Sequence, residues 1–215
     1  MIKAVIFDMD GVISDTSKLH ATQELKILSR FGINISMEEL IKRYSGVRTK
    51  KFFKELLEGI GAEYDLAELM HEKWTGMLEM SKKHVPEIPG AISLINEAKK
   101  AGLKLAIASG SDKNYVLTVL KTLGVQDLFD AITSSEEVKN GKPEPDVFLL
   151  AAKRMSVAPE NCIVIEDGIS GMIAAKKAGM LSIGLVKDRN DESYPADIRV
   201  ESLNEINLKV LMNRK

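Results

Sequence analysis

Short runs of apolar residues alternate with longer amphipathic segments along most of this chain of 215 residues. The runs are continuous rather than alternating, which is typical of strands covered on both faces, as in a parallel sheet. Strands are therefore predicted at 4–7, 104–108, 131–133, 162–165, 181–186 and, with fewer apolar residues, 197–200.

Amphipathic segments with recognisable ends separate these strands. Pro89 can begin a helix that ends at Gly102, and further helices are predicted at about 113–123 and 168–178, each followed by a glycine. Single helices between strands give βαβ units. We therefore expect an α/β fold with a doubly wound parallel sheet.

One stretch, residues 16–83, breaks this alternation, because it shows helical periodicity and no convincing strand. The first of its four apolar stripes places four residues on one face: Leu19, Thr22, Leu25 and Leu28. We expect residues 16–83 to form a small α-helical domain inserted after the first strand. The α/β core would then consist of residues 1–15 and 84–215.

Composition excludes several classes of protein. The 30 Lys and Arg residues against 31 Asp and Glu give a net charge of −1, which argues against nucleic-acid binding through a strong positive field. Apolar stretches are too short for a membrane span or a signal peptide. The single cysteine, Cys162, lies in a strand-like run and is expected to be an inert core residue in a reducing compartment. These features predict a cytoplasmic protein.

Charged and small polar residues stand at the ends of four predicted strands, where open α/β sheets bind ligands. In strand order they are Asp8 and Asp10, Ser109 and Gly110, Lys142, and Glu166 and Asp167. Crowded carboxylates repel one another unless a cation lies among them, and Mg²⁺ prefers such hard oxygen ligands. The three histidines are too scattered to suggest zinc.

The same edge of the sheet offers what a phosphoryl group needs. Lys142 could supply a cation, and Ser109 with the amide of Gly110 could supply donors. Asp8 could attack phosphorus, and Asp10 could act as general acid and then as general base. Each motif alone has a structural explanation as a turn, a cap or a loop, but their recurrence at four successive strand ends favours catalysis. The nucleotide-binding patterns GxxxxGK[ST] and GxGxxG are absent from the sequence, which disfavours kinases and dehydrogenases.

These motifs resemble those of the haloacid dehalogenase-like superfamily of phosphohydrolases and phosphomutases. Residues 7–12, 107–111, 141–143 and 164–168 match its four motifs in order, and the resemblance spans the whole chain. It implies a Rossmann-like core with Asp8 as nucleophile and Mg²⁺ ligand. Asp10 would be the acid/base residue and a ligand through its main-chain carbonyl. Glu166 and Asp167 would complete the metal site, and Ser109, Gly110 and Lys142 would bind phosphate.

The helical segment resembles the small cap of the β-phosphoglucomutase-like subgroup, which closes over the site, excludes water and reads the sugar. The resemblance implies substrate contacts from seven residues: Thr16, His20, Gly46, Val47, Arg48, Ser111 and Asn114. Some positions depart from the mutase pattern. Arg48 follows Gly-Val directly, the cap lysine of mutases aligns near His71 with Lys73 only close to it, and residue 112 is Asp.

The expected function is that of a Mg²⁺-dependent phosphatase that hydrolyses a small phosphorylated metabolite, such as a sugar phosphate, through a phospho-aspartate intermediate. A hexose-phosphate mutase of the β-phosphoglucomutase type is the alternative, because both activities share their first half-reaction. A non-catalytic sugar-phosphate-binding protein is a third reading, disfavoured because Asp8, Asp10, Lys142 and Asp167 are all present. The expected partner is the metabolite, not nucleic acid or a membrane, and the chain is expected to be a monomer.

Overall fold

A single parallel sheet organises the chain in the computed structural model, which describes residues 1–44 and 49–212. The strands found in these residues are β1 (Ala4–Phe7), β2 (Lys104–Ser109), β3 (Ala131–Ser134), β4 (Cys162–Glu166), β5 (Leu181–Leu185) and β6 (Ile198–Val200). They lie in the order β3-β2-β1-β4-β5-β6, and every neighbouring pair is parallel. The order reverses between β1 and β4, which is where sheets of this kind bind ligands.

Helices cover both faces of the sheet. Successive side chains of each strand point to opposite faces, so each face carries apolar residues that pack against helices. Val5 and Phe7 pack with α5 (Ala91–Lys100), α6 (Lys113–Thr122) and α9 (Leu208–Met212) on one face. On the other face, Ala4 and Ile6 pack with α7 (Asp146–Met155) and α8 (Ile169–Lys177). This arrangement confirms the predicted doubly wound α/β fold. Cys162 is buried in the second core, as expected, and burial raises the pKa of its thiol to about 11.

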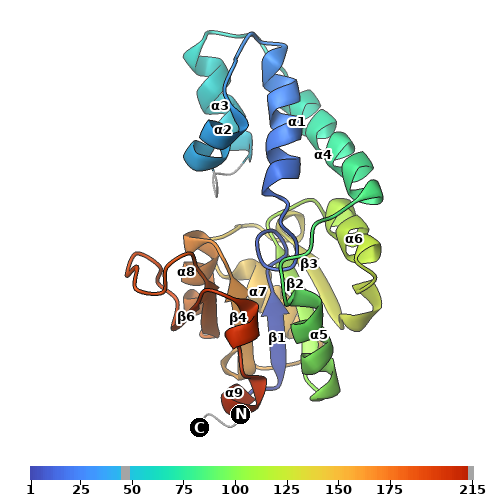
Figure 1. Cartoon of the computed structure of the whole chain (residues 1–215), viewed down its shortest axis with the longest axis vertical. Helices are drawn as coiled ribbons and strands as arrows, with labels where there is room; N and C mark the ends of the chain where they lie inside the picture. The colour runs from blue at the N-terminus through green and yellow to red at the C-terminus, as the bar shows by residue number, and fades with distance from the viewer. Residues whose placement is uncertain (45–48, 213–215) are drawn as a thin grey trace.

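Four further helices lie beyond the carboxyl end of β1 (Figure 1). They are α1 (Ser17–Ser29), α2 (Met37–Tyr44), α3 (Thr49–Gly59) and α4 (Leu66–Lys83). Their apolar residues form a core of their own, with Leu28, Phe53 and Leu57 fully buried. Helices were predicted at all four places. None of the helices in the described part of the chain is both long and apolar enough to cross a membrane.

The predicted apolar face of α1 is correct for its three leucines, Leu19, Leu25 and Leu28, which are buried or half-buried, and wrong for Thr22. Thr22 is exposed, whereas the polar residues Gln23 and Glu24 are buried against α4. Gln23 Nε2 donates to the carbonyl of Glu72 at 3.2 Å, and its side chain fills the space that a Cβ at Gly76 would occupy. The buried side of α1 therefore also includes two polar residues with partners on α4, which the spacing of leucines does not reveal.

The chain passes between the sheet and α1–α4 twice, and the two passages lie side by side. The backbone N–H of Asp15 donates to the carbonyl of Pro86 at 3.0 Å, and that of Ile88 donates to the carbonyl of Ile13 at 2.9 Å. Ser14 Oγ also donates to the carbonyl of Pro86 at 3.0 Å. The helical segment is thus joined to the sheet by a short paired connection that begins directly after β1.

Candidate active site

Three acidic side chains and one lysine meet at the carboxyl ends of β1 and β4. Asp8 follows β1, Glu166 is the last residue of β4, and Asp167 comes next; carboxylate oxygens of the three lie within 4.8 Å of one another. Lys142, from the connection between β3 and α7, places Nζ 2.5 Å from Asp8 Oδ1 and 3.2 Å from Glu166 Oε2. The sheet therefore assembles residues that are more than 130 positions apart in the sequence.

Burial and mutual repulsion raise the pKa of all three carboxyl groups. The pKa of Asp8 is raised by burial and then by Asp10, against the pull of Lys142. For Glu166, burial and the charge of Asp8 raise the pKa well above its usual value. Asp167 keeps contact with solvent at the rim, but loss of hydration among the packed groups and the charge of Asp8 raise its pKa to about 7. A cation placed among these groups would be strongly favoured.

Two glycines make room for these carboxylates. A Cβ on Gly171, in α8, would lie 2.0 Å from Glu166 Oε1, and a Cβ on Gly11 would lie 2.1 Å from Asp167 Oδ2. Gly11 also has a φ of +83°, which L-residues with side chains adopt at a cost. The backbone is thus shaped so that both carboxyl groups can approach Asp8.

Hard oxygen ligands are what this cluster offers to a metal ion. Its three members contribute carboxylate oxygens only, with no nitrogen or sulfur ligand. Such a donor set fits Mg²⁺, which takes one or two carboxylates and completes its shell with water or phosphate oxygens.

Asp10 lies beside this cluster, but its side chain faces the helical segment. Thr16 Oγ1 donates a hydrogen bond to Asp10 Oδ1, and Ser111 Oγ donates to Oδ2 at 2.6 Å. His20 Nε2 lies 3.6 Å from Oδ1. Burial alone would raise the pKa of Asp10, but His20, Ser111 and Thr16 together lower it below its usual value. The structure thus brings together the predicted residues Asp10, Thr16, His20 and Ser111.

The loop after β2 presents backbone to the same edge of the sheet. Ser109 is fully buried, and its Oγ accepts from the backbone N–H of Ser111 at 3.0 Å. Gly110 is exposed, with no atom within 4 Å of the place a Cβ would take, and its carbonyl accepts from Ser135 Oγ at 2.8 Å. A ligand could therefore approach the Gly110 backbone closely while Ser135 fixes the orientation of its peptide group.

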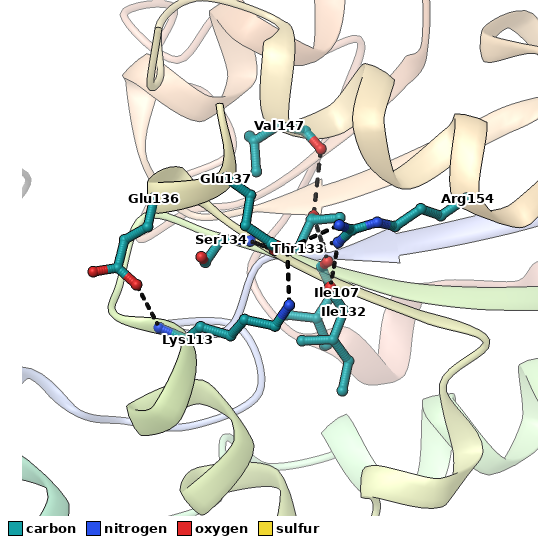
Figure 2. A network of polar contacts seen from close by, with 9 residues as sticks. All are labelled: Ile107, Lys113, Ile132, Thr133, Ser134, Glu136, Glu137, Val147 and Arg154. Atoms are coloured by element: carbon teal, nitrogen blue, oxygen red, sulfur yellow. Dashed lines mark hydrogen bonds and ion pairs between the residues drawn. The ribbon is translucent and has the colours of Figure 1, made fainter. Parts of the chain in front are cut away.

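A polar network behind this loop connects β3, α6 and α7 (Figure 2). Glu137 accepts hydrogen bonds from Arg154 Nη2 at 2.8 Å, from Lys113 Nζ at 2.8 Å and from the backbone N–H of Ser134 at 3.1 Å. The hydrogen bond from Arg154 is the main reason why the pKa of Glu137 is lowered to about 2. The ammonium group of Lys113 is therefore engaged by Glu137, while the predicted substrate residue Asn114 is exposed on the first turn of α6.

The sequence analysis did not predict that Lys73 is buried and paired with a carboxylate. Its side chain is fully buried in the helical segment, with Nζ 2.5 Å from Glu24 Oε1 and 2.6 Å from Thr49 Oγ1. Burial lowers the pKa of Lys73, and Glu24 opposes this effect. The available signal was its position, because Lys73 falls on the same apolar helical stripe as Leu69 and Met77.

Lys73, rather than the exposed His71, is thus the residue of α4 that points inward. Thr49, to which it donates, directly follows the predicted substrate loop. The loop residues themselves, Gly46, Val47 and Arg48, lie outside the described residues.

The sheet order, the acidic cluster at its switch point, the lysine and the small-residue loop together define an α/β enzyme class built for phosphoryl transfer. Comparison with known proteins agrees with this class. The sequence model of the haloacid dehalogenase-like hydrolases matches residues 5–185, so the chain belongs to this family. It is a phosphohydrolase or a phosphomutase of the family, with the Rossmann-like core that the motifs implied.

Named relatives include both kinds of activity. β-Phosphoglucomutase of Bacillus subtilis (strain 168) is 32% identical over 217 residues, covering 98% of this chain and 94% of the relative. Hexitol phosphatase B of Escherichia coli (strain K12) is 30% identical over 219 residues, covering 98% and 97%. The crystal structure of β-phosphoglucomutase from Clostridium difficile superimposes with a TM-score of 0.83 at 30% identity, covering 98% of this chain and 96% of that one.

Proposed function

We propose that this chain is a Mg²⁺-dependent phosphatase that hydrolyses a small phosphorylated metabolite, a sugar phosphate by class, through a phospho-Asp8 intermediate. The observation that carries the proposal is the cluster at the switch point: Asp8, Glu166 and Asp167 within 4.8 Å of one another, and Lys142 Nζ 2.5 Å from Asp8. One lysine opposes three carboxylates there, so the site favours a divalent cation and a bound phosphate together.

Four residues would hold the metal: Asp8, Glu166, Asp167 and, through its main-chain carbonyl, Asp10. Bound Mg²⁺ would supply charge neutralisation at Asp8 and at the phosphate oxygens. Lys142, Ser109 and the amide of Gly110 would bind the remaining phosphate oxygens, on which charge accumulates as the phosphoryl group is transferred.

The reaction would proceed in two displacements at phosphorus. Although His20, Ser111 and Thr16 lower the pKa of Asp10 in the free chain, an anionic phosphate ester bound beside it would favour the protonated form. An Asp8 oxygen forms a bond to phosphorus while the bond to the ester oxygen breaks, and Asp10 in this protonated form gives its proton to the leaving oxygen. Water then attacks the phosphorus of phospho-Asp8 and gives its proton to Asp10. Inorganic phosphate leaves, and both carboxyl groups return to their starting states. The balance is ester plus water giving alcohol plus phosphate.

Residues 16–83 would act as a cap domain above a core of residues 1–15 and 84–215. Their position beyond the carboxyl end of β1 supports this role, as do the contacts of Thr16 and His20 with Asp10 (Figure 1). A cap that covers the bound ester would exclude water during the first displacement and select the alcohol portion of the substrate. The resemblance assigns such selection to residues 46–48 and Asn114 as well.

A mutase of the β-phosphoglucomutase type is the second candidate, and the proximity of His20 to Asp10 favours it, because a histidine at the cap base can link the cap to the catalytic loop. Two observations weigh more heavily for the phosphatase. Asp112 caps α6 by accepting from the backbone N–H of Tyr115 at 3.0 Å, and Lys113 is paired with Glu137. Neither presents a free cation for the second phosphate that a bisphosphate intermediate carries.

Phosphate release from a panel of sugar and polyol phosphates, with Mg²⁺ and with EDTA, tests the proposal. We expect turnover of at least one ester that EDTA abolishes and added Mg²⁺ restores. Acid quenching during the first turnover should yield protein heavier by one phosphoryl group, located on Asp8 by peptide mass spectrometry. Formation of glucose 6-phosphate from β-glucose 1-phosphate with a bisphosphate primer would instead identify a mutase. Absence of turnover with every ester would leave a binding protein.

A further inference from the structure

Three aromatic side chains from separate helices meet next to Asp10. His20 from α1 lies 6.0 Å from Trp74 of α4 and 5.9 Å from Tyr115 of α6, measured between ring centroids, and both contacts are edge-to-face. Trp74 and Tyr115 lie 5.6 Å apart with their planes tilted by 41°. Such ring contacts stabilise a fixed mutual orientation beyond simple burial.

Of these three residues, Tyr115 lies in α6, one of the helices that pack against the sheet. It lies in the first turn of α6, and the Asp112 carboxylate fixes that turn by accepting its backbone N–H at 3.0 Å. The side chain is fully buried. α4 also packs on α6 further along, where Thr122 Oγ1 donates to the carbonyl of Ser81 at 2.9 Å. Tyr115 is therefore held rigidly, and the position of the His20 ring depends on it.

We infer that Tyr115 is a positioning residue, whose ring holds the His20 imidazole so that Nε2 faces the Asp10 carboxylate at the base of the helical segment. The inference rests on the proposed function, in which Asp10 gives the proton to the leaving oxygen. Tyr115 acts through His20 and through the packing of α4 on α6, and it does not touch the reacting atoms.

The ring of Tyr115, and not its hydroxyl, carries this role. Tyr115 Oη is buried near the hydroxyls of Ser81 and Thr16, yet it makes no hydrogen bond of acceptable geometry among the described residues. The contact between Tyr115 and His20 is made by the two rings, so loss of the hydroxyl should leave the orientation of the imidazole unchanged. Tyr115→Phe should therefore preserve the orientation of the His20 ring, whereas Tyr115→Leu should not.

The test compares two esters that differ in their need for a proton. p-Nitrophenolate leaves without protonation, whereas the alkoxide of a sugar phosphate requires it, and kcat/KM reports the first displacement. For Tyr115→Leu we expect kcat/KM for the best sugar phosphate of the wild-type panel to fall about 10-fold or more, since general-acid catalysis contributes roughly 10²–10⁴. We expect the value for p-nitrophenyl phosphate to change by less than about 3-fold, because that ester does not draw on the same proton transfer. Tyr115→Phe should retain both values.

Controls separate this role from general damage to α6. Val119→Ala, on the buried side of the same helix but outside the ring cluster, should change kcat/KM for the two esters by the same factor or not at all. Fluorescence of Trp74, the single tryptophan in the sequence, should shift to longer wavelength in Tyr115→Leu and stay unchanged in Val119→Ala.

Equal losses for both esters in Tyr115→Leu would overturn the inference, as would no loss, or an equal loss in Tyr115→Phe. If the wild type hydrolyses neither ester, the proposed function fails and this inference fails with it.

Discussion

The sheet edge and the helical segment both bury charged side chains, but they balance them differently. In the helices, one lysine meets one carboxylate: Lys73 Nζ lies 2.5 Å from Glu24 and also reaches the hydroxyl of Thr49. At the sheet edge, Lys142 faces Asp8, Glu166 and Asp167, so one positive charge opposes three acidic groups. The helical pair balances one positive with one negative charge, whereas at the sheet edge acidic groups outnumber the lysine among the described residues. Buried charge therefore stabilises structure in one region and prepares chemistry in the other.

Removing the central carboxylate should have the largest effect and should separate activity from stability. Asp8→Asn is expected to lower kcat/KM by roughly 10⁴-fold or more, because the attacking oxygen is lost and residues that act as one unit fail together. The free energy of unfolding should stay the same or rise, since one of three repelling acids is gone. Phosphate release and urea unfolding measure the two quantities, with Asp188→Asn, on an exposed loop, as the control. Retained turnover would show that the nucleophile is another residue.

Breaking the helical pair should have the opposite signature, with a loss of stability first. Glu24→Gln leaves Lys73 buried among neutral partners and should lower the free energy of unfolding by about 3 kcal/mol. The double variant Glu24→Leu/Lys73→Met should recover most of this loss, because an apolar pair of similar volume needs no charge partner. Urea unfolding of the single and double variants gives the answer. A double variant no more stable than the single one would mean that the pair is not self-contained.

Crowding the sheet edge by one methyl group should have an intermediate effect on activity. Gly171→Ala would place a Cβ 2.0 Å from Glu166 Oε1, so that carboxyl group must move away from Asp8 and Lys142. We expect kcat/KM to fall by roughly 10²-fold, the cost of misplacing a catalytic group by about an ångström, and more Mg²⁺ to be needed for half-maximal rate. Gly59→Ala, at the end of α3, meets no atom within 4 Å and serves as the matched control. The idea fails if both variants behave alike.

The smallest expected effect concerns the network behind the Gly110 loop. The pKa of Glu137 is about 2 in the folded chain, below the usual value of 4.5, so its ionised form stabilises the fold above pH 4.5. This contribution is lost as the pH falls from 4.5 towards 2. Because the side chain is 19% exposed and partly screened, E137Q should lower the free energy of unfolding at pH 7 by about 1–2 kcal/mol.

The pH dependence supplies the check on that value. The stability difference between wild type and E137Q should shrink below pH 4.5, as followed by urea unfolding at several pH values. E160Q, at an exposed position, should show no such trend. A difference that stays constant with pH would mean that Glu137 acts through packing rather than charge.

Local patterns in the sequence predicted the sheet well, because each buried strand is a short apolar run that a polar residue ends. The predicted ends were one residue early for β2, β3 and β4, which end at Ser109, Ser134 and Glu166, and one residue late for β5. The acidic cluster could also be anticipated, because parallel strands bring their carboxyl ends to one edge.

The missed features depend on which helix packs against which. Lys73 is buried because α1 supplies Glu24, and Tyr115 matters because α1 and α4 bring His20 and Trp74 to it. The role of Gly171 likewise depends on the rotamer of Glu166. Pairings of this kind between distant segments leave no periodicity in a single sequence.

The paired connection at Ser14 and Pro86 has an evolutionary consequence. Since the chain leaves the sheet and returns to it at adjacent points, replacing α1–α4 by another segment would require joins at only two neighbouring positions. Exchange or enlargement of this helical segment would alter which molecules reach Asp8 without rebuilding the strands that hold it. New specificities can therefore arise without any change to the residues at the sheet edge.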